Sequence, residues 1–207
     1  MQWVRMLHNI AHGKNCAIIA GGTSVNDYDL SLLPDNYIKI VLNNAEIKGI
    51  NFDYRIFFDP CVIKLLKKIN LKNEKLIGFS NAYYPRVNYC YTLNEFERLG
   101  YPVNDWDNIG LKALILVKKI FNPDSIYLFG YDFYIKDGIS HFYGDKVGEN
   151  EKYNMPSTLE DHKKKLPEYC ERFDIVSSME NVYNCNEQSK LKIFPYALPR
   201  ELNPQSA

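Results

Sequence analysis

The sequence predicts a single α/β domain, spanning residues 1–207, with a mostly parallel sheet and helices on both faces. Short apolar runs recur along the chain, segments with helical spacing lie between them, and turn-forming residues follow the runs. This alternation is typical of βαβ units, which place their strands in parallel. The length suits one domain. Residues 1–14 are expected to form an N-terminal extension and residues 190–207 an irregular tail.

Six runs have the length and composition of buried strands. They cover Asn15–Ala20, Tyr37–Leu42, Tyr54–Phe58, Lys75–Phe79, Ser125–Gly130 and Asn181–Cys185. The first ends at Gly21-Gly22 and the second at Asn43-Asn44, which are residues that favour turns.

Four segments are expected to be helical. They are Val62–Ile69, Leu93–Leu99, Asp107–Phe121 and Pro156–Phe173. Thr92 and Glu95 make a capping box for the second segment. The third is apolar over most of its circumference, which predicts a helix packed in the interior. Pro167 predicts a break or kink in the fourth.

Composition excludes several classes of protein. Lys+Arg and Asp+Glu balance at 25 each, so no net positive charge favours duplex nucleic acid or an acidic membrane. The five cysteines are odd in number and lack CxxC spacing, which argues against a disulfide framework or a zinc site. No run reaches the roughly 18 apolar residues of a membrane span, and residues 1–15 lack a secretory core. A reducing cytoplasm is the expected compartment.

In a parallel α/β sheet the ligand binds in the crevice beyond the carboxyl ends of the strands. The first strand ends at Gly21, Gly22 and Ser24. Glycines allow backbone N–H groups to approach an anion, and the N-terminus of a following helix adds partial positive charge. The turn matches neither GxGxxG nor a Walker loop, and a plain tight turn is the alternative interpretation.

The next two strand ends carry Asn43, Asn44 and Asp59. Amide groups both donate and accept hydrogen bonds, which suits the ribose and base edges of a nucleotide. Asn and Asp also start turns well, and this is the alternative. Three polar strand ends on one rim favour a binding site.

The fifth strand leads into an aromatic loop that contains Asp132, Tyr134 and Tyr143. The carboxylate suits a hydroxyl or a metal ion, and the tyrosine hydroxyls suit phosphate oxygens. Packing of this loop on the core is the alternative. His162, beside Asp161 near the start of the last long helix, has the character of a general base. A surface role is the alternative, and His141 is a rival base.

Several motifs occur in a familiar order. IIAGGTS, VLNNAE, FFDP, DNIGLKAL and IYLFGYDFY, with a second tyrosine nine residues further on, resemble the bacterial sialyltransferases that use CMP-sialic acid. They also resemble the wider family that includes the archaeal 6-hydroxymethylpterin diphosphokinase, and similar short proteins occur in bacteriophage genomes. The resemblance extends from about residue 15 to about residue 190.

The resemblance implies a Rossmann-like fold and a role for each matching position. The donor's phosphate and cytidine would lie near Gly21, Gly22 and Ser24, and further donor contacts would come from Asn43 or Asn44 and from Asp59. The nucleotide would touch Asn108 and Gly110. The departing phosphate would be bound by Tyr134 and Tyr143, and His162 would be the base. The sequence departs from the family at Ile109, where the family has Ser, and at Asp59, where it usually has Asn.

The leading expectation is therefore a metal-independent glycosyltransferase that takes a sugar from a nucleotide donor, with CMP as the nucleotide. Its partners would be that donor and an acceptor, and self-association into a homo-oligomer stays open. The first alternative is a diphosphokinase-like transferase that uses ATP and Mg²⁺, with Asp59 and Asp132 as metal ligands. The second is a phage protein that binds a nucleotide without turning it over.

Overall fold

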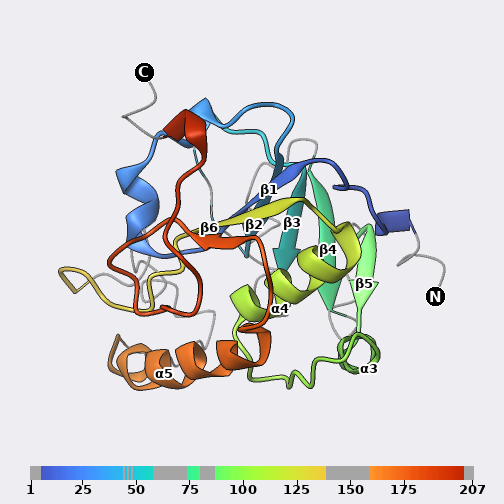
Figure 1. Cartoon of the computed structure of the whole chain (residues 1–207). Coiled ribbons are helices and arrows are strands. Elements are labelled where there is room, and N and C mark those ends of the chain that lie inside the picture. The colour runs from blue at the N-terminus through green and yellow to red at the C-terminus, as the bar shows by residue number, and fades with distance from the viewer. Residues whose placement is uncertain are drawn as a thin grey trace.

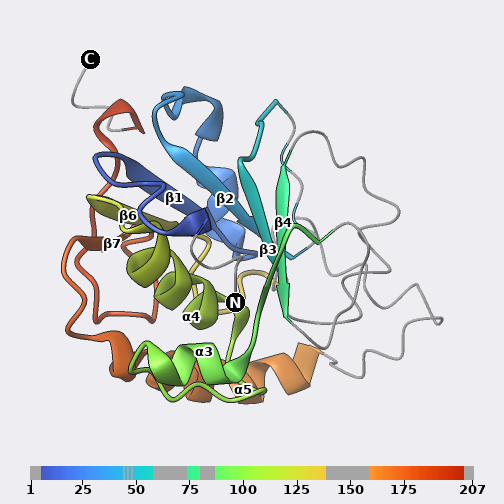
Figure 2. The same ribbon diagram turned by 90° about the vertical axis from the view of Figure 1, so that its right-hand side faces the viewer.

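A computed structural model describes residues 6–43, 45, 47, 49–57, 74–79, 87–138 and 159–202 of the chain. Its centre is a seven-stranded sheet in the order β5-β4-β3-β2-β1-β6-β7 (Figures 1 and 2). Every neighbouring pair of strands is parallel. The strand order reverses beside β1, which is the switch point at which α/β sheets open a crevice at the carboxyl ends of their strands.

The predicted strands are confirmed, each with its ends within one residue of the observed bounds. The strands are β1 Asn15–Ile19, β2 Ile38–Leu42, β3 Tyr54–Phe57, β4 Lys75–Phe79, β5 Tyr89–Tyr91, β6 Ser125–Phe129 and β7 Val182–Asn184. Strand β5 was not predicted. It has only three residues and lies at the sheet edge, where pairing with β4 decides its conformation.

The described α-helices are α3 Leu93–Arg98, α4 Ile109–Leu116 and α5 Leu159–Glu171. The capping box of α3 is present. A π-helical turn over Val117–Phe121 completes the predicted interior helix. A break or a kink was predicted at Pro167, and the break is wrong, because α5 continues to Glu171. Pro167 is exposed, so water can solvate the backbone group that loses its partner. The predicted helix Val62–Ile69 lies outside the described residues.

Alternate residues of each strand face two separate hydrophobic clusters, as strand geometry requires. Ile18 and Ile40 pack on the side covered by α4, whose residues 110–116 are all buried. Ile19 and Val41 face the opposite side. The described cover on that side includes the short 3-10 helices η1 Thr23–Asp27, η2 Leu30–Leu32 and η6 Arg200–Leu202, together with loop residues such as Ile50 and Phe52.

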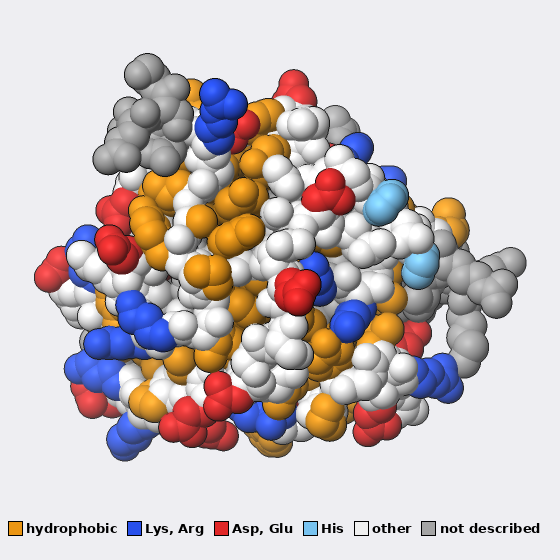
Figure 3. Space-filling view, in the orientation of Figure 1, with side chains coloured by type: hydrophobic (Ala, Val, Ile, Leu, Met, Phe, Trp, Pro, Cys, Tyr) orange, Lys and Arg blue, Asp and Glu red, His pale blue; other side chains and the backbone are white. Residues whose placement is uncertain are grey.

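The structure also bears on the cysteines, on membrane-spanning segments and on surface charge. Cys16, Cys90, Cys170 and Cys185 are free thiols, and Cys61 lies outside the described residues. In the described ranges no helix has the length and apolar character to cross a bilayer. On the face seen in Figure 3, Asp and Glu side chains lie beside Lys and Arg, and several of the basic side chains gather at the lower left.

Candidate active site at the carboxyl edge of the sheet

The loop after β1 lies directly against the end of β6. The Gly22 N–H donates to the Gly130 carbonyl oxygen at 3.0 Å. A Cβ on Gly22 would lie 2.6 Å from the carboxyl carbon of Asp132. Gly130 has φ of +71°, in the left-handed region that favours glycine. Glycine is required at these two positions because two backbone segments approach each other closely.

Asp132 joins three segments at this edge. Its carboxylate accepts from the Ser24 N–H at 2.8 Å and also from the Ser24 hydroxyl. It further accepts from the Thr23 hydroxyl at 3.4 Å and from the Asn186 amide at 2.8 Å. Asp132 is 2% exposed, so these bonds form away from water. The carboxylate faces protein donors on the β1 and β7 loops, and we interpret it as the group that holds those loops together.

This arrangement also explains the local structure after β1. The chain after β1 forms the 3-10 helix η1, whose N-cap is Gly22, without a side-chain cap hydrogen bond. The Ser24 side chain is committed to Asp132. Ser24 therefore contributes to the site by fixing the loop backbone rather than by offering a free hydroxyl.

Tyr134 lies beside this cluster, and Asn186 orients it. The Asn186 amide nitrogen donates to the Tyr134 hydroxyl oxygen at 3.2 Å. Because that oxygen accepts, its own proton is directed elsewhere and can be donated to a ligand oxygen. Sequence reasoning missed Asn186. Its signal was available, since Asn186 lies two residues after β7, much as Asn43 lies directly after β2.

Asn43 offers a buried acceptor at the end of β2. It adopts a left-handed conformation with φ of +53°. Its side-chain oxygen Oδ1 is buried and has no hydrogen-bond partner among the described residues. The Tyr91 hydroxyl shares this property, but it lies on the edge strand β5. A buried acceptor without a donor is costly, so a donor from a ligand is the natural complement of Asn43.

A buried arginine fixes the backbone around Asn43. Arg55 on β3 is 2% exposed and donates to the carbonyl oxygens of Asn43 at 2.6 Å and Ala45 at 2.9 Å. Its Nε donates to Glu74 at 2.6 Å, and this carboxylate compensates the buried charge. The loop that carries Asn43 is thus held by a charged side chain from the neighbouring strand.

The N-terminus of α4 reaches the same edge. The Asn108 side chain caps the helix by accepting from the Gly110 N–H at 2.6 Å. The Tyr131 hydroxyl, next to Asp132 in the chain, donates to the Gly110 carbonyl oxygen at 3.1 Å. A Cβ at Gly110 would lie 2.8 Å from the Tyr131 ring. Burial raises the pKa of Tyr131 well above its usual value, so the hydroxyl stays a neutral donor.

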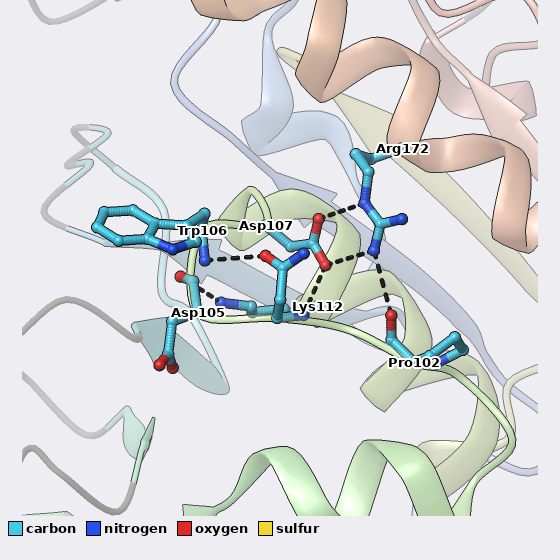
Figure 4. A network of polar contacts seen from close by, with 7 residues as sticks. Pro102, Asp105, Trp106, Asp107, Lys112 and Arg172 are labelled. Carbon is cyan, nitrogen blue, oxygen red and sulfur yellow. Dashed lines mark hydrogen bonds and ion pairs between the residues drawn. The ribbon is translucent and has the colours of Figure 1, made fainter.

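An ion pair between a buried carboxylate and a half-buried arginine connects the end of α5 to the loop before α4 (Figure 4). Arg172, which directly follows α5, donates to the Asp107 carboxylate at 2.6 and 2.8 Å. The Asn104 N–H donates to the same carboxylate at 2.8 Å. Burial alone would raise the pKa of Asp107, but the bonds from Arg172 and Asn104 and the charges of Arg172 and Lys112 outweigh it. The pKa of Asp107 is therefore lowered.

Asp107→Asn should lower the free energy of unfolding by about 2 kcal/mol at neutral pH, because hydrogen bonds to charged partners are lost. The lowered pKa makes the Asp107 contribution present above the unfolded value near 3.8 and lost as the pH falls through the folded value. The difference in unfolding free energy between the two proteins should therefore shrink as the pH falls below about 4. Asp35→Asn, at an exposed position, is the control. A stability difference between wild type and Asp107→Asn that stays the same at acid pH would contradict this role of the Asp107 carboxylate.

Several predicted site residues lie outside the described part of the structure. They are Asn44, Asp59, His141 and Tyr143, together with the side chain of His162. The backbone of His162 lies in the first turn of α5. Figures 1 and 2 both place α5 at the end of the molecule toward which the arrowhead of β4 points. The helix that carries His162 is thus at the carboxyl edge of the sheet.

The opposite edge of the sheet has a cavity of about 320 Å³ at the amino ends of β2, β3 and β4. Its two carboxylates are already engaged, because Asp53 accepts from the Lys39 N–H at 2.8 Å and Glu74 pairs with Arg55. Among the described residues no three His, Cys, Asp or Glu side chains come together as a metal site. The candidate site is therefore the carboxyl edge.

Comparisons with known proteins place the fold. No protein-family model and no curated protein matches the sequence. Solved structures do match. The sialyltransferase CstII from Campylobacter jejuni with CMP-3FNeuAc, a substrate analogue, has a TM-score of 0.61 at 14% identity, over 91% of this chain and 88% of that chain.

Two further structures agree with this match. The monofunctional α-2,3-sialyltransferase Cst-I from Campylobacter jejuni has a TM-score of 0.61 at 14% identity and covers 89% of this chain and 80% of its own. Cst-II with a trisaccharide acceptor and CMP has a TM-score of 0.59 at 13% identity, over 92% and 88%. The chain therefore has the fold of these sialyltransferases over about nine-tenths of its length.

Proposed function

We propose that the protein is a glycosyltransferase that takes a sugar from a CMP-linked donor. The fold shared with CstI and CstII supports this, since CstII has been solved with CMP and with CMP-3FNeuAc. The observation that carries the proposal is the buried, unpartnered Oδ1 of Asn43 at the carboxyl edge. A ribose hydroxyl or the cytosine amino group would supply the missing donor.

The surrounding groups suit the rest of such a donor. Tyr134 would donate its free proton to the phosphate of the departing CMP, and Tyr143 is proposed to do the same. Each hydrogen bond of this kind contributes roughly 2–4 kcal/mol to stabilisation of the transition state. Gly21 and Gly22 would border the phosphate from the loop after β1, while Asn44, Asp59 and the Asn108–Gly110 turn complete the proposed donor contacts.

In the proposed reaction the acceptor hydroxyl oxygen attacks the anomeric carbon of the donor sugar. A new C–O bond forms, the bond from that carbon to the phosphate oxygen breaks, and CMP leaves with the electron pair. His162 would take the proton from the acceptor hydroxyl. Tyrosine hydroxyls stabilise the leaving phosphate without a metal ion in this scheme.

CMP should raise the Tm of the protein in the absence of Mg²⁺, because a ligand that binds only the native state stabilises it by mass action. Asn43→Ala removes the buried acceptor and should weaken CMP binding by roughly tenfold, the equivalent of one hydrogen bond. Isothermal titration gives both dissociation constants. The exposed Asn36→Ala, on the loop before β2, is the control.

The same thermal-shift measurement, run with CMP, CDP, UDP, GDP and ATP, discriminates between the hypotheses. A shift with ATP only when Mg²⁺ is present would favour the diphosphokinase-like alternative over CMP transfer. CMP binding without turnover of CMP-sialic acid would indicate a nucleotide-binding protein that is not an enzyme. No shift with CMP would contradict the proposed function.

A further inference from the structure

Trp106 exposes 83% of its surface, more than any other large hydrophobic residue recorded as exposed in the described part of the chain. Tryptophan normally contributes to stability by burying a large apolar area. At Trp106 the indole remains in water, so folding gains almost nothing from it. A second exposed aromatic, Tyr196, is 47% exposed and lies near the C-terminus.

The loop that presents Trp106 is nevertheless firmly held. The Trp106 N–H donates to the Asn104 side chain at 3.0 Å, and the Lys112 ammonium donates to the Asp105 carbonyl oxygen at 3.0 Å. Arg172 donates to the Pro102 carbonyl oxygen at 3.1 Å. Figure 4 shows the indole ring directed away from the Asp107–Arg172 pair.

This combination indicates a binding platform. Ordering a loop costs conformational entropy, and the bonds around Trp106 meet that cost before any ligand arrives. A rigid exposed aromatic ring can then stack on a flat apolar ligand face with little further loss of entropy. The position fits, because Trp106 lies two residues before Asn108, the N-cap of α4 at the carboxyl edge.

The charges beside the ring select the kind of ligand. Asp105 is exposed next to Trp106, and its carboxylate repels an anionic group such as a phosphate or a sialic acid carboxylate. A neutral pyranose meets no such repulsion. Its C–H face can cover the indole, while its hydroxyls can donate to the Asp105 carboxylate and meet the Asn104 amide.

We propose that Trp106 is the stacking platform for a neutral pyranose ring of the acceptor, with Asp105 as a hydrogen-bond acceptor for its hydroxyls. This inference rests on the proposed glycosyltransferase function, because it assigns the acceptor side of the same site. It names a specificity-determining residue in the loop before α4, separate from the groups assigned to the CMP donor.

Fluorescence tests the proposal directly. The chain has two tryptophans, so Trp3→Phe leaves Trp106 as the sole indole. That variant, with and without CMP, is titrated with methyl β-galactoside, methyl β-glucoside and methyl β-N-acetylglucosaminide. At least one neutral glycoside should shift the Trp106 emission to the blue as the ring leaves water. Trp3→Phe combined with Asp105→Ala should bind that glycoside several-fold more weakly.

Kinetics give a second readout. With CMP-sialic acid as donor and the glycoside that binds as acceptor, Trp106→Ala should raise the acceptor KM by roughly threefold to tenfold, as expected for loss of an aromatic contact. Trp106→Phe should restore part of the loss. Leu32 is an exposed apolar residue on η2, so Leu32→Ala is the matched control. It should leave the KM values of the donor and of the acceptor unchanged.

The outcomes separate this inference from the proposed function. If CMP raises the Tm but no glycoside in the panel changes the Trp106 emission, the acceptor platform is overturned and CMP binding stands. If CMP alone shifts the emission and the glycosides do not, Trp106 belongs to the donor site and the proposal fails. If a glycoside shifts the emission but CMP gives no thermal shift, the sugar platform stands and the CMP-dependent function fails.

Discussion

Replacing Asp132 with alanine should lower the free energy of unfolding by about 4 kcal/mol and remove the stabilisation by CMP. The carboxylate is the common acceptor for the Ser24 N–H, the Ser24 and Thr23 hydroxyls and the Asn186 amide. In the Asp132→Ala variant these donors lose their hydrogen-bond partner, and several of them are buried. The loops after β1 and β7 would separate from the end of β6, and the proposed phosphate site would be lost.

Denaturant unfolding and CMP-dependent thermal shifts measure the two effects on Asp132→Ala. If this variant does not fold, Asp132→Asn keeps one acceptor oxygen and should show a smaller loss of stability with weakened CMP binding. The control is Asp35→Ala, whose carboxylate is exposed and lies 3.8 Å from Lys39. Wild-type stability in Asp132→Ala would contradict the role of this carboxylate in joining the loops.

Replacing His162 with alanine should lower kcat by roughly 10²–10⁴-fold, the usual contribution of a positioned general base. The donor Kd should stay close to the wild-type value, because the base meets the acceptor hydroxyl and not the nucleotide. The rate of the wild-type enzyme should rise with pH, since only the neutral imidazole accepts a proton. Initial rates of transfer from CMP-sialic acid across pH 5–9 measure both effects.

His12→Ala is the matched control for His162→Ala, because His12 is exposed near the N-terminus. Full activity of His162→Ala would make His141 the next candidate base. Loss of CMP binding in the same variant would instead mean that His162 contacts the phosphate. In that case its assignment as the base would be withdrawn.

The strands were predictable because their apolar runs are short, consecutive and bounded by turn residues. Ser125–Phe129 is an example, with a run of apolar residues followed by Gly130. The short strand β5 was not predictable, since three residues carry almost no periodicity and their conformation depends on β4. The break predicted at Pro167 does not occur in α5. Local sequence rules do not say whether the turn around a proline faces water, where the unpaired backbone group can be solvated.

Much of the candidate site followed from one rule, that ligands bind at the carboxyl ends of parallel strands. Gly22, Asn43 and Tyr134 were predicted as site residues in this way, and the structure brings their segments to one edge. Asn186 follows the same rule but was overlooked. Nothing in the sequence marks Trp106 as a site residue, because the sequence alone does not show whether a tryptophan is exposed or buried.

By itself the sequence determined the fold class, the strand positions and the edge of the sheet at which polar residues gather. These properties depend on local hydrophobic pattern and turn chemistry. Only the tertiary structure decided what each polar group does. The sequence suggested Asp132 as a group that binds a ligand, but in the structure it is buried among donors from the loops after β1 and β7, and we interpret it as holding those loops together. The Oδ1 atom of Asn43, by contrast, is buried without a hydrogen-bond partner among the described residues. The reason is physical: hydrogen-bond partners far apart in the chain exist only once the strands have paired.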